Sequence, residues 1–461
     1  MRIVVFGTGL YYLKRKTELP GETKIIAFLD NDRELQGRLM DGISVYAPSR
    51  ISELDYDMIV LASASSAAMK EQLLSLGISE NRIMFWEQFI SSRSHGILVK
   101  FQAENIEIMR KSTKVLLIVP AVNYGGGFLA GLYAAMGLKS KGCHVVITAP
   151  VVDHRTVREV NDCGIDVWAC PSLPYIEESE LRWIQAFDFI FVNSLQNMIC
   201  VDRLCGNKPV IWWLHENRDQ YEDIVGQYGK DINIEHLTKT EIFAVSSLAK
   251  KNFKEFYPEI SLDQLLFGIP DFYNETVDRD RDKIIIAVIG TVTPKKNQTE
   301  LIRAIKKLSC HEQNQIECWI IGLDGQRKYR EQLDKTINDL SQIKMCGEFS
   351  RKEMERVFPQ LDIIVCSSLE ETMSIAVIEG MMNKKICIAS NKTGIADFIR
   401  NGENGFVYES GNENDLLIKL KYVIQNFQAL DFMKDKARDT YEKNFSMEKF
   451  SDRLYCIIQN L

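Results

Sequence analysis

The chain has 461 residues, of which 46% are hydrophobic and 26% charged, and this balance excludes a disordered or fibrous protein. At about 150 residues per domain, the length predicts roughly three domains. The net charge of −7 argues against a generally basic nucleic-acid binder. No apolar run reaches the ~18 residues that a membrane-spanning helix needs.

The cysteines, the histidines and the beginning of the chain bear on its location and on metal binding. Most of the 11 cysteines lie in apolar runs and none forms a CxxC pair, as expected of buried thiols in a reducing compartment. The six histidines show no metal-binding spacing, so we expect no metal site. The segment Met1–Gly9 lacks the long apolar stretch and the cleavage site of a signal peptide. We therefore expect a cytoplasmic protein.

Three segments repeat a pattern of a short buried strand, a glycine turn and an amphipathic helix. This alternation predicts an α/β fold with parallel sheets that are covered on both faces. The first segment, residues 1–90, is interpreted as an accessory Rossmann-like domain, and residues 91–113 as a linker. Its strands are expected over Arg2–Phe6, Lys24–Leu29, Asp57–Ala62 and Arg82–Phe85.

Two further segments follow the linker. The second covers residues 114–277, and the charged run Asp278–Asp282 separates it from the third, residues 283–439. The tail, residues 440–461, is predicted to form one amphipathic helix. The strands are expected over residues 115–119, 144–148, 189–192, 210–214 and 242–245, then over 284–289, 318–321, 363–366 and 385–389.

A glycine turn in the first segment is typical of dinucleotide binding. Gly7 and Gly9 follow the first predicted strand, and Asp30 stands about 20 residues further on. Tyr12 occupies the place of the third glycine of that fingerprint, so the signal is weak. The segment is similar to small Rossmann-like domains attached to bacterial sugar-modifying enzymes. A packing or partner-docking domain without a ligand and a nicotinamide-dependent oxidoreductase both remain open interpretations.

The most informative segment is residues 367–381, which follows a predicted strand and begins a helix. Open α/β sheets bind ligands at this edge, and the free amides of a helix that begins near Ser374 favour a phosphate. Glu371 and Glu379 lie roughly 12 Å apart if the segment is helical. One carboxylate can then accept hydrogen bonds from sugar hydroxyls and the other from a ribose. The spacing alone fits a solvated acidic helix start equally well.

The spacing Glu-x7-Glu followed by Gly-Met-Met resembles the signature of retaining glycosyltransferases of family 4, which have the GT-B fold. The segment Gly290–Gln298 resembles the family segment whose lysine touches the donor diphosphate, and Lys296 takes that place. The resemblance covers roughly residues 114–461. It implies two facing Rossmann-like domains, the acceptor domain over 114–277 and the nucleotide-sugar donor domain over 283–439, with the helix over 440–461 crossing back to the acceptor domain. Further family-like segments are Cys318–Gly322, Lys344–Phe349 (the loop against the nucleobase), Gly394–Ile395, Asn401–Phe406 and Asn444–Phe450.

The resemblance implies a retaining, metal-independent transferase. The donor is a UDP- or GDP-linked sugar, which is a substrate and not a cofactor, and the acceptor is a glycan, a lipid or a protein. The expected setting is bacterial surface polysaccharide or glycoconjugate synthesis, where a lipid-linked acceptor would bring the protein to the inner face of the cell membrane. Residues 1–90 would contact a partner protein. The alternative is a non-catalytic GT-B partner or an acceptor-recognition subunit of a glycosyltransferase complex.

The resemblance also assigns site residues. Glu371 is expected to hold the donor sugar, His215 to donate a hydrogen bond to a donor hydroxyl, and Lys296 to stabilise the leaving diphosphate. Asn193-Ser194 and Ser246-Ser247 also end predicted strands and are weaker candidates. The candidate donor-binding residues are Glu379, Gly125, Gly126, Gly290, Thr291, Cys346, Gly347, Thr372, Ser374 and Ile375.

The sequence departs from the family pattern at two places. Thr372-Met373-Ser374 stands where the family often has Gly-Phe-Gly, and Thr291 stands where many members have an arginine. The loss of two glycines narrows the backbone conformations available near the sugar. These departures keep the non-catalytic alternative open.

Overall fold

The computed structural model describes residues 1–63, 66–104, 112–123, 125–173, 175–176, 178–206, 208–229, 232–274 and 282–461. The predicted linker residues 105–111 and the charged residues 278–281 lie outside this description. The chain divides into two compact units. The first unit comprises Met1–Ile242 with Phe253–Ser261, and the second comprises Phe243–Asn252 with Leu262–Leu461.

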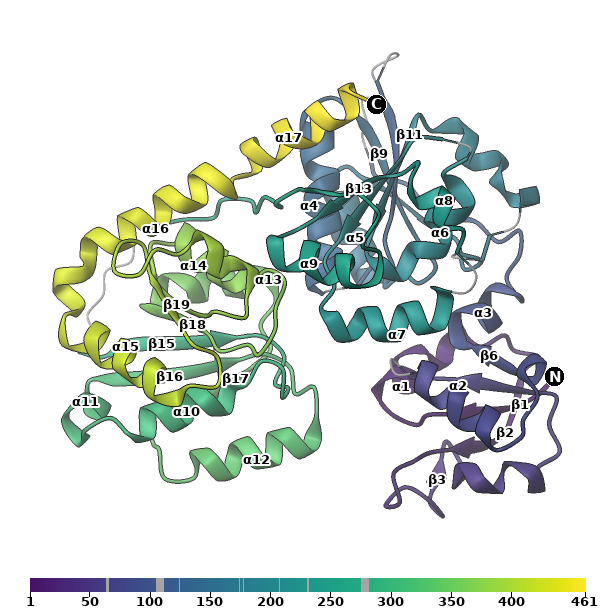
Figure 1. The fold of residues 1–461 in the computed structure, drawn as a ribbon, viewed down its shortest axis with the longest axis horizontal. Helices are drawn as coiled ribbons and strands as arrows, with labels where there is room; N and C mark the ends of the chain where they lie inside the picture. The colour runs from purple at the N-terminus through teal and green to yellow at the C-terminus, as the bar shows by residue number, and fades with distance from the viewer. Residues whose placement is uncertain are drawn as a thin grey trace. The chain divides into compact units, whose positions relative to one another are not determined.

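The first unit begins with a six-stranded sheet in the order β3-β4-β2-β1-β5-β6 (purple in Figure 1). Side chains of β1 alternate between two core clusters, with Val4 and Phe6 in one and Ile3 and Val5 in the other. Both faces of the sheet are therefore buried, as helices on both faces of a parallel sheet require. The elements are β1 (Arg2–Phe6), α1 (Leu10–Arg15), β2 (Lys24–Leu29), β3 (Leu39–Met40), β4 (Ile43–Tyr46), β5 (Met58–Leu61), α2 (Ser66–Ser75), β6 (Ile83–Phe85) and α3 (Trp86–Ser91).

The second sheet has eight strands in the order β14-β13-β12-β11-β8-β9-β10-β7. The pairs β14–β13, β12–β11, β11–β8, β8–β9 and β9–β10 are parallel, and β7 runs antiparallel to β10. The elements are β7 (Val99–Phe101), β8 (Lys114–Ile118), α4 (Gly126–Ser140), β9 (His144–Ala149), α5 (His154–Asp162), β10 (Asp166–Ala169), β11 (Phe189–Asn193), α6 (Met198–Leu204), β12 (Val210–Leu214), α7 (Arg218–Tyr228), α8 (Ile234–Leu237), β13 (Glu241–Ala244), α9 (Ser247–Phe256) and β14 (Asp263–Gln264).

The third sheet has six parallel strands in the order β17-β16-β15-β18-β19-β20. Lys344–Phe349, expected as a loop, instead contributes to strand β17, which pairs with β16. The elements are β15 (Ile284–Ile289), α10 (Gln298–Lys306), α11 (Cys310–Asn314), β16 (Ile316–Ile321), α12 (Arg327–Ile337), β17 (Ile343–Gly347), α13 (Arg351–Val357), β18 (Ile363–Cys366), α14 (Ile375–Met382), β19 (Ile386–Ser390), β20 (Phe406–Tyr408), α15 (Glu413–Gln425), α16 (Asp431–Asn444) and α17 (Met447–Gln459).

The tail contains a helix break that the sequence did not predict. Instead of one helix over 440–461, α16 ends at Asn444 and α17 begins at Met447. Phe445 is fully buried, and its carbonyl oxygen accepts a 2.9 Å hydrogen bond from the amide of Ile269. The side chain of Ser446 then caps α17 by accepting from the amide of Lys449. A serine cap satisfies an amide at a helix start, so the break is locally stable.

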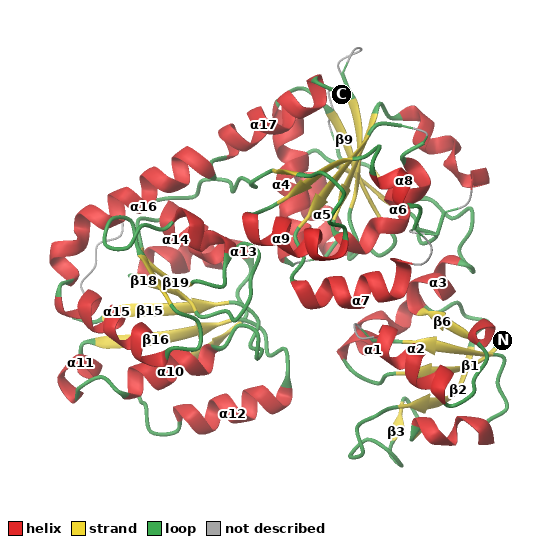
Figure 2. Ribbon diagram, in the orientation of Figure 1, coloured by secondary structure: helices red, strands yellow, loops and turns green. Residues whose placement is uncertain are grey.

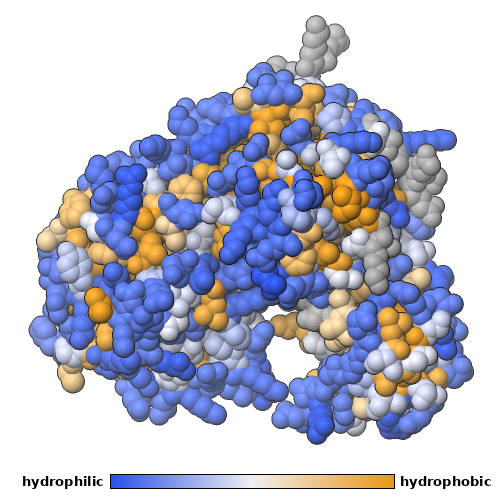
Figure 3. All heavy atoms as spheres, in the orientation of Figure 1, coloured by the Kyte–Doolittle hydropathy of each residue, from blue (hydrophilic) through white to orange (hydrophobic). Residues whose placement is uncertain are grey.

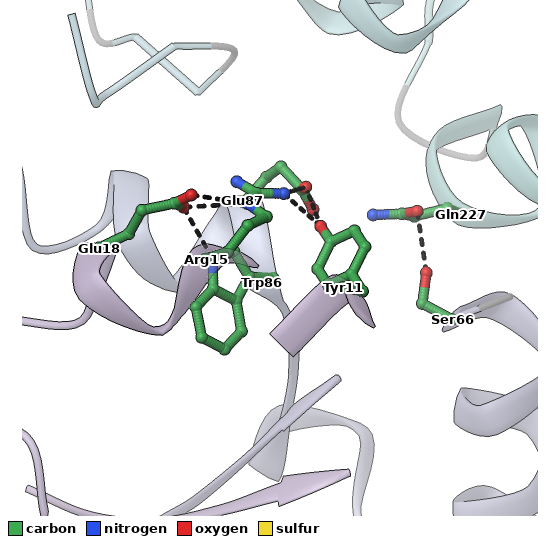
Figure 4. Close-up of polar contacts among 7 residues, drawn as sticks. All are labelled: Tyr11, Arg15, Glu18, Ser66, Trp86, Glu87 and Gln227. Atoms are coloured by element: carbon green, nitrogen blue, oxygen red, sulfur yellow. Dashed lines mark hydrogen bonds and ion pairs between the residues drawn. The ribbon is translucent and has the colours of Figure 1, made fainter. Parts of the chain in front are cut away.

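A half-buried ionic cluster joins α1, the turn that follows it and α3 in the first sheet's domain (Figure 4). Arg15 donates from Nε to Glu18 at 2.8 Å and forms an ion pair with Glu87, while Trp86 donates to Glu18 at 2.9 Å. Tyr11 also donates to Glu87. Burial opposes ionisation of Glu87, but the attraction of Arg15 outweighs it and lowers the pKa of Glu87. Arg15 and Glu87 therefore remain ionised as a pair.

Contacts within the first unit join the first domain to the second sheet's domain. Ser66 on α2 donates to Gln227 on α7 at 3.1 Å (Figure 4). The rings of Phe85 and Tyr228 lie 6.2 Å apart. The hydroxyl of Ser91 donates to the carbonyl of Ser172. Residues 1–90 thus already pack against another part of the same chain.

Helices accompany all three sheets (Figure 2). Hydrophilic residues predominate on the face drawn in Figure 3. In the part of the chain that the structure describes, no helix combines the length and the apolar character needed to cross a bilayer.

Candidate active site

In the third sheet, the strand order reverses between β15 and β18, which lie side by side although two strands separate them along the chain. Open α/β sheets bind ligands at such a point, outside the carboxyl ends of the strands. The loops that leave the sheet here are residues 290–297 after β15 and 367–374 after β18. These loops contain six of the predicted site residues, namely Gly290, Thr291, Lys296, Glu371, Thr372 and Ser374.

Hydrogen bonds hold these two loops together. The amide of Leu369 donates to the carbonyl of Lys295 at 2.8 Å, and the hydroxyl of Ser367 donates to the carbonyl of Lys296 at 2.8 Å. The hydroxyl of Ser390 on β19 donates to the carbonyl of Ser368 at 2.5 Å. The backbone on both sides of the site is therefore held in place before any ligand binds.

Lys296 and Glu371 form an ion pair between the two loops, with Nζ 2.6 Å from Oε1. The second carboxylate oxygen of Glu371 accepts from the hydroxyl of Ser368 at 2.6 Å and from the thiol of Cys366 at 3.2 Å. The side chain of Lys296 is 29% exposed and that of Glu371 is 15% exposed. Both groups are thus largely shielded, yet solvent reaches the lysine.

The ion pair keeps both partners charged. Burial raises the pKa of Glu371, but the attraction of Lys296 and the hydrogen bonds outweigh this effect, so the net shift is downward. Burial lowers the pKa of Lys296, but the attraction of Glu371 outweighs it, so the net shift is upward. A fixed cation and a fixed carboxylate therefore stand side by side near neutral pH.

Glycines end the three neighbouring strands β15, β16 and β17. The amide of Gly290 donates to the carbonyl of Ile321, and the amide of Gly322 donates to the carbonyl of Gly347, both at 2.8 Å. Gly322 has φ +153°, and a Cβ atom there would collide with the carbonyl oxygen of Gly290. The side chain of Lys296 runs beside Gly290, where an added Cβ would lie 3.1 Å from its Cε. These glycines allow the loops and the lysine to approach closely.

The loop after β18 leads into α14. Ser374 has extended backbone before the first helical residue, Ile375, and its side chain makes no capping hydrogen bond. Thr372 and Ser374 are buried. Thr291 on the neighbouring loop is exposed, and its carbonyl accepts from Gln298 at 3.1 Å. Cys346 is half-buried on β17.

Glu379 lies on α14 and has a different partner from Glu371. Its side chain is buried and forms an ion pair with Arg351 on α13. The guanidinium of Arg351 in turn lies 4.7 Å from the centre of the Phe272 ring. Burial raises the pKa of Glu379 more than Arg351 lowers it. A ribose that binds the Glu379 carboxylate must therefore share this carboxylate with Arg351. No sequence motif indicated that Arg351 contacts Glu379.

The predicted residues Gly125, Gly126 and His215 belong to the first unit. Gly125 precedes α4 and Gly126 is its first residue, and both are exposed. His215 follows β12, and its Nε2 lies 2.7 Å from Oδ1 of Asn193 at the end of β11. Burial lowers the pKa of His215 to about 3, so the imidazole is neutral at physiological pH. The buried neighbour Glu216 accepts from the backbone amide of His215 at 2.9 Å.

The structure thus contains two separate sets of predicted residues. In the second unit it brings together Lys296, Glu371, Gly290 and the start of α14. In the first unit, His215 follows β12 and the Gly125–Gly126 turn follows β8, and these are the two strands that flank β11. The sequence missed the hydrogen-bond partners of these residues, above all Ser368 and Arg351.

Two family models match different parts of the chain. Residues 271–440 match glycosyl transferases group 1, and this match includes Lys296, Glu371 and Glu379. Residues 1–84 match the family described as C2185-like, N-terminal. The chain therefore carries a glycosyl transferases group 1 domain built on its third sheet.

Curated relatives and solved structures extend this result. An uncharacterized glycosyltransferase of Methanocaldococcus jannaschii is 27% identical over 163 residues, which are 35% of this chain and 44% of the relative. The UDP-Gal:alpha-D-GlcNAc-diphosphoundecaprenol alpha-1,3-galactosyltransferase of Escherichia coli is 23% identical over 188 residues, 40% of this chain and 47% of the relative. The chain thus spans less than half the length of these curated relatives.

The structure of Anabaena HepE in complex with UDP and glucose aligns with a TM-score of 0.63 at 16% identity. The alignment covers 76% of this chain and 100% of that chain. This likeness shows the fold, which is the GT-B architecture of two Rossmann-like domains. The chain thus shares the GT-B fold, and its residues 271–440 match the glycosyl transferases group 1 model.

Proposed function

We propose that the chain is a retaining, metal-independent glycosyltransferase that moves a sugar from a nucleoside-diphosphate donor to a glycan, lipid-linked or protein acceptor. The observation that carries this proposal is the Lys296–Glu371 pair at the β15/β18 edge of the third sheet. Its cation suits a diphosphate and its carboxylate suits sugar hydroxyls.

Lys296 supplies the charge that the reaction needs. Negative charge grows on the diphosphate as the bond to the sugar breaks, and a fixed cation lowers the barrier to that step. Lys296 is held by Glu371 and by its loop before the donor arrives, so little reorganisation is needed. The start of α14 adds backbone N–H groups that favour an anion.

Glu371 is proposed to orient the donor sugar and not to attack it. Its carboxylate is fixed on one side by Lys296 and on the other by Ser368, which leaves it as an acceptor for hydroxyl groups. We propose a front-face reaction in which the leaving phosphate takes the proton of the acceptor hydroxyl. This route retains the configuration of the sugar and needs no separate base.

Two of the relatives support a proposal for the donor and the setting. UDP occurs in the Anabaena HepE structure, and a UDP-linked sugar is the donor that the name of the E. coli relative states. We therefore propose a UDP-linked donor, with GDP-linked sugars as the second choice. The same E. coli relative acts on a lipid-linked acceptor, which supports surface polysaccharide or glycoconjugate synthesis at the inner face of the cell membrane.

The proposal is tested with the purified full chain and a panel of UDP- and GDP-sugars. We expect one donor to release its nucleoside diphosphate, with EDTA having no effect, and the released or transferred sugar to keep its anomeric configuration by NMR. Lys295→Ala is the matched control, since Lys295 is the exposed neighbour of Lys296. Binding of a donor without any release or transfer would instead support the alternative, a non-catalytic GT-B subunit.

That alternative is favoured by one feature of the same loop. Thr372 and Met373 are buried where the family often has glycine and phenylalanine, so the sugar must fit beside side chains that are already packed. A subunit that only recognises a sugar tolerates this crowding more easily than an enzyme that must admit an acceptor.

A further inference from the structure

A hydrogen-bonded chain of three groups lies at the carboxyl ends of β11 and β12 in the first unit. Nε2 of His215 lies 2.7 Å from Oδ1 of Asn193. The other side-chain atom of Asn193, Nδ2, donates to the carbonyl oxygen of Gly127 in the first turn of α4 at 2.9 Å. Residues from three elements thus meet through one amide.

The chemistry of these groups allows only one arrangement of protons. The carbonyl oxygen of Gly127 can only accept, so the amide nitrogen of Asn193 must face it and the amide oxygen must face His215. The amide oxygen can also only accept, so His215 must donate from Nε2. Turning the amide over would place its oxygen against the carbonyl oxygen of Gly127, and moving the imidazole proton would place two acceptors face to face.

Packing keeps this arrangement in place. The side chain of Asn193 is fully buried, and a Cβ atom on Gly131 would lie only 3.4 Å from its Nδ2. The backbone carbonyl of Asn193 accepts from Nδ2 of Asn197 at 3.0 Å. The ring of Trp213 packs edge-on against the imidazole of His215, with centroids 4.3 Å apart. Neither the amide nor the ring has room to reorient freely.

We propose that Asn193 is a positioning residue that holds His215 in the tautomer with the proton on Nε2. In this tautomer Nδ1 carries the lone pair, so a hydrogen bond between Nδ1 and a sugar hydroxyl would be one that His215 accepts. This conclusion reverses the donor role expected from the sequence. The role of His215 toward a sugar hydroxyl deepens the proposed function and rests on it. The assignment of the tautomer does not depend on the proposed function.

The tautomer is tested directly, without any substrate. The imidazole nitrogens of 15N-histidine-labelled full chain distinguish the two neutral tautomers by NMR, and His215→Gln assigns the signals. We expect the Nε2-protonated form in the native chain and a mixture in Asn193→Leu, which removes both hydrogen bonds. The Nδ1-protonated form in the native chain, or an unchanged signal in Asn193→Leu, would overturn the proposal.

Two more variants keep this test decisive. Asn161→Leu is the matched control, since Asn161 is a half-buried asparagine that donates only to backbone carbonyls. Its His215 signals should equal those of the native chain. If Asn193→Leu fails to fold, Asn193→Asp keeps an acceptor for Nε2 while placing an oxygen against the Gly127 carbonyl. We expect this variant to keep the Nε2-protonated form, and its loss would contradict the proposal.

Kinetics test whether Asn193 acts through His215. With the donor that the panel identifies, we expect Asn193→Leu to lower kcat about tenfold, the equivalent of one lost oriented hydrogen bond, with a smaller change in KM. The double variant Asn193→Leu/His215→Ala should be no slower than His215→Ala alone. Additive losses would show that Asn193 acts independently and would overturn the positioning role. If no donor reacts, the proposed function fails while the NMR result still decides the tautomer.

Discussion

The first and third sheets share the arrangement of their central strands but differ in the side chains at the point where the strand order reverses. In the first sheet β1 lies between β2 and β5, and in the third sheet β15 lies between β16 and β18. A glycine follows the central strand in both, Gly7 after β1 and Gly290 after β15. A Cβ atom at Gly7, which has φ +110°, would collide with the carbonyl oxygen of Ala62. A glycine with positive φ thus follows the central strand in both sheets.

The charges at the two turns are opposite. In the first sheet a carboxylate oxygen of Asp30 accepts from the amide of Thr8 at 3.0 Å and from its hydroxyl at 2.5 Å. Asp30, the acid that the dinucleotide fingerprint would place on a ribose, is thus already bound by Thr8 and by the amide of Asp32. In the third sheet Lys296 brings a cation to the corresponding turn. A shared arrangement of central strands does not make a shared site, because side-chain charge decides which ligand is accepted.

Removal of the cation should have the largest effect. We expect Lys296→Ala to lower turnover about a hundredfold to a thousandfold, the usual loss when one fixed group that stabilises transition-state charge is removed. Steady-state release of the nucleoside diphosphate measures this loss. Lys295→Ala should stay within threefold of the native chain. A Lys296→Ala enzyme with native turnover and donor affinity would contradict the role of this residue.

Neutralising the carboxylate should have the next largest effect. We expect Glu371→Gln to lower kcat about tenfold to a hundredfold, because the amide accepts hydroxyl groups less strongly and no longer holds Lys296 by charge. The measurement is kcat and KM with the reactive donor. Near-native turnover in this variant would exclude Glu371 from holding the sugar.

The corresponding change in the first sheet should alter stability and not activity. Asp30→Asn weakens two hydrogen bonds to Thr8, and we expect it to cost ~1–2 kcal/mol of folding free energy. Turnover should remain within twofold of the native chain. Thermal unfolding and donor turnover are measured on the same preparation. A tenfold loss of turnover with native stability would mean that the first domain takes part in the reaction.

The smallest expected effect is the change with pH in how much the Lys296–Glu371 ion pair contributes to the stability of the fold. Folding lowers the pKa of Glu371. The ion pair therefore stabilises the folded chain at pH values above the ordinary carboxyl pKa. This stabilisation is lost as the pH falls through the lower pKa that Glu371 has in the folded chain. We therefore expect the difference in thermal midpoint between native chain and Glu371→Gln to shrink from pH 7 to pH 3. Glu331→Gln, which removes an exposed ion pair with Arg327, should show little difference at either pH.

Much of the fold was predictable because its central strands are short apolar runs between turn residues. The bounds of β1, β2, β12, β15 and β18 agree with the predicted strands. The edge strands β7, β14 and β20 have two or three residues each, so no local pattern distinguishes them from loops. They exist because a neighbouring strand offers hydrogen bonds.

The sequence predicted those site residues that lie within a family-like motif. It did not predict the side chains that contact them from other segments of the chain. The resemblance singled out Lys296 and Glu371, and the structure places them in direct contact. It gave no sign of Arg351, which lies 28 residues before Glu379 on another helix. Nor did it indicate that Asn193 faces His215, since 22 residues separate them along the chain.

The central claim is that the third sheet, and not the first, binds the donor diphosphate. Calorimetric titration of UDP and of GDP into the native chain, Lys296→Ala and Asp30→Asn tests it most directly. We predict that one nucleotide binds the native chain, that Lys296→Ala weakens this binding at least about tenfold, the equivalent of roughly 1.4 kcal/mol, and that Asp30→Asn leaves it unchanged. Native affinity in Lys296→Ala together with lost affinity in Asp30→Asn would contradict the account.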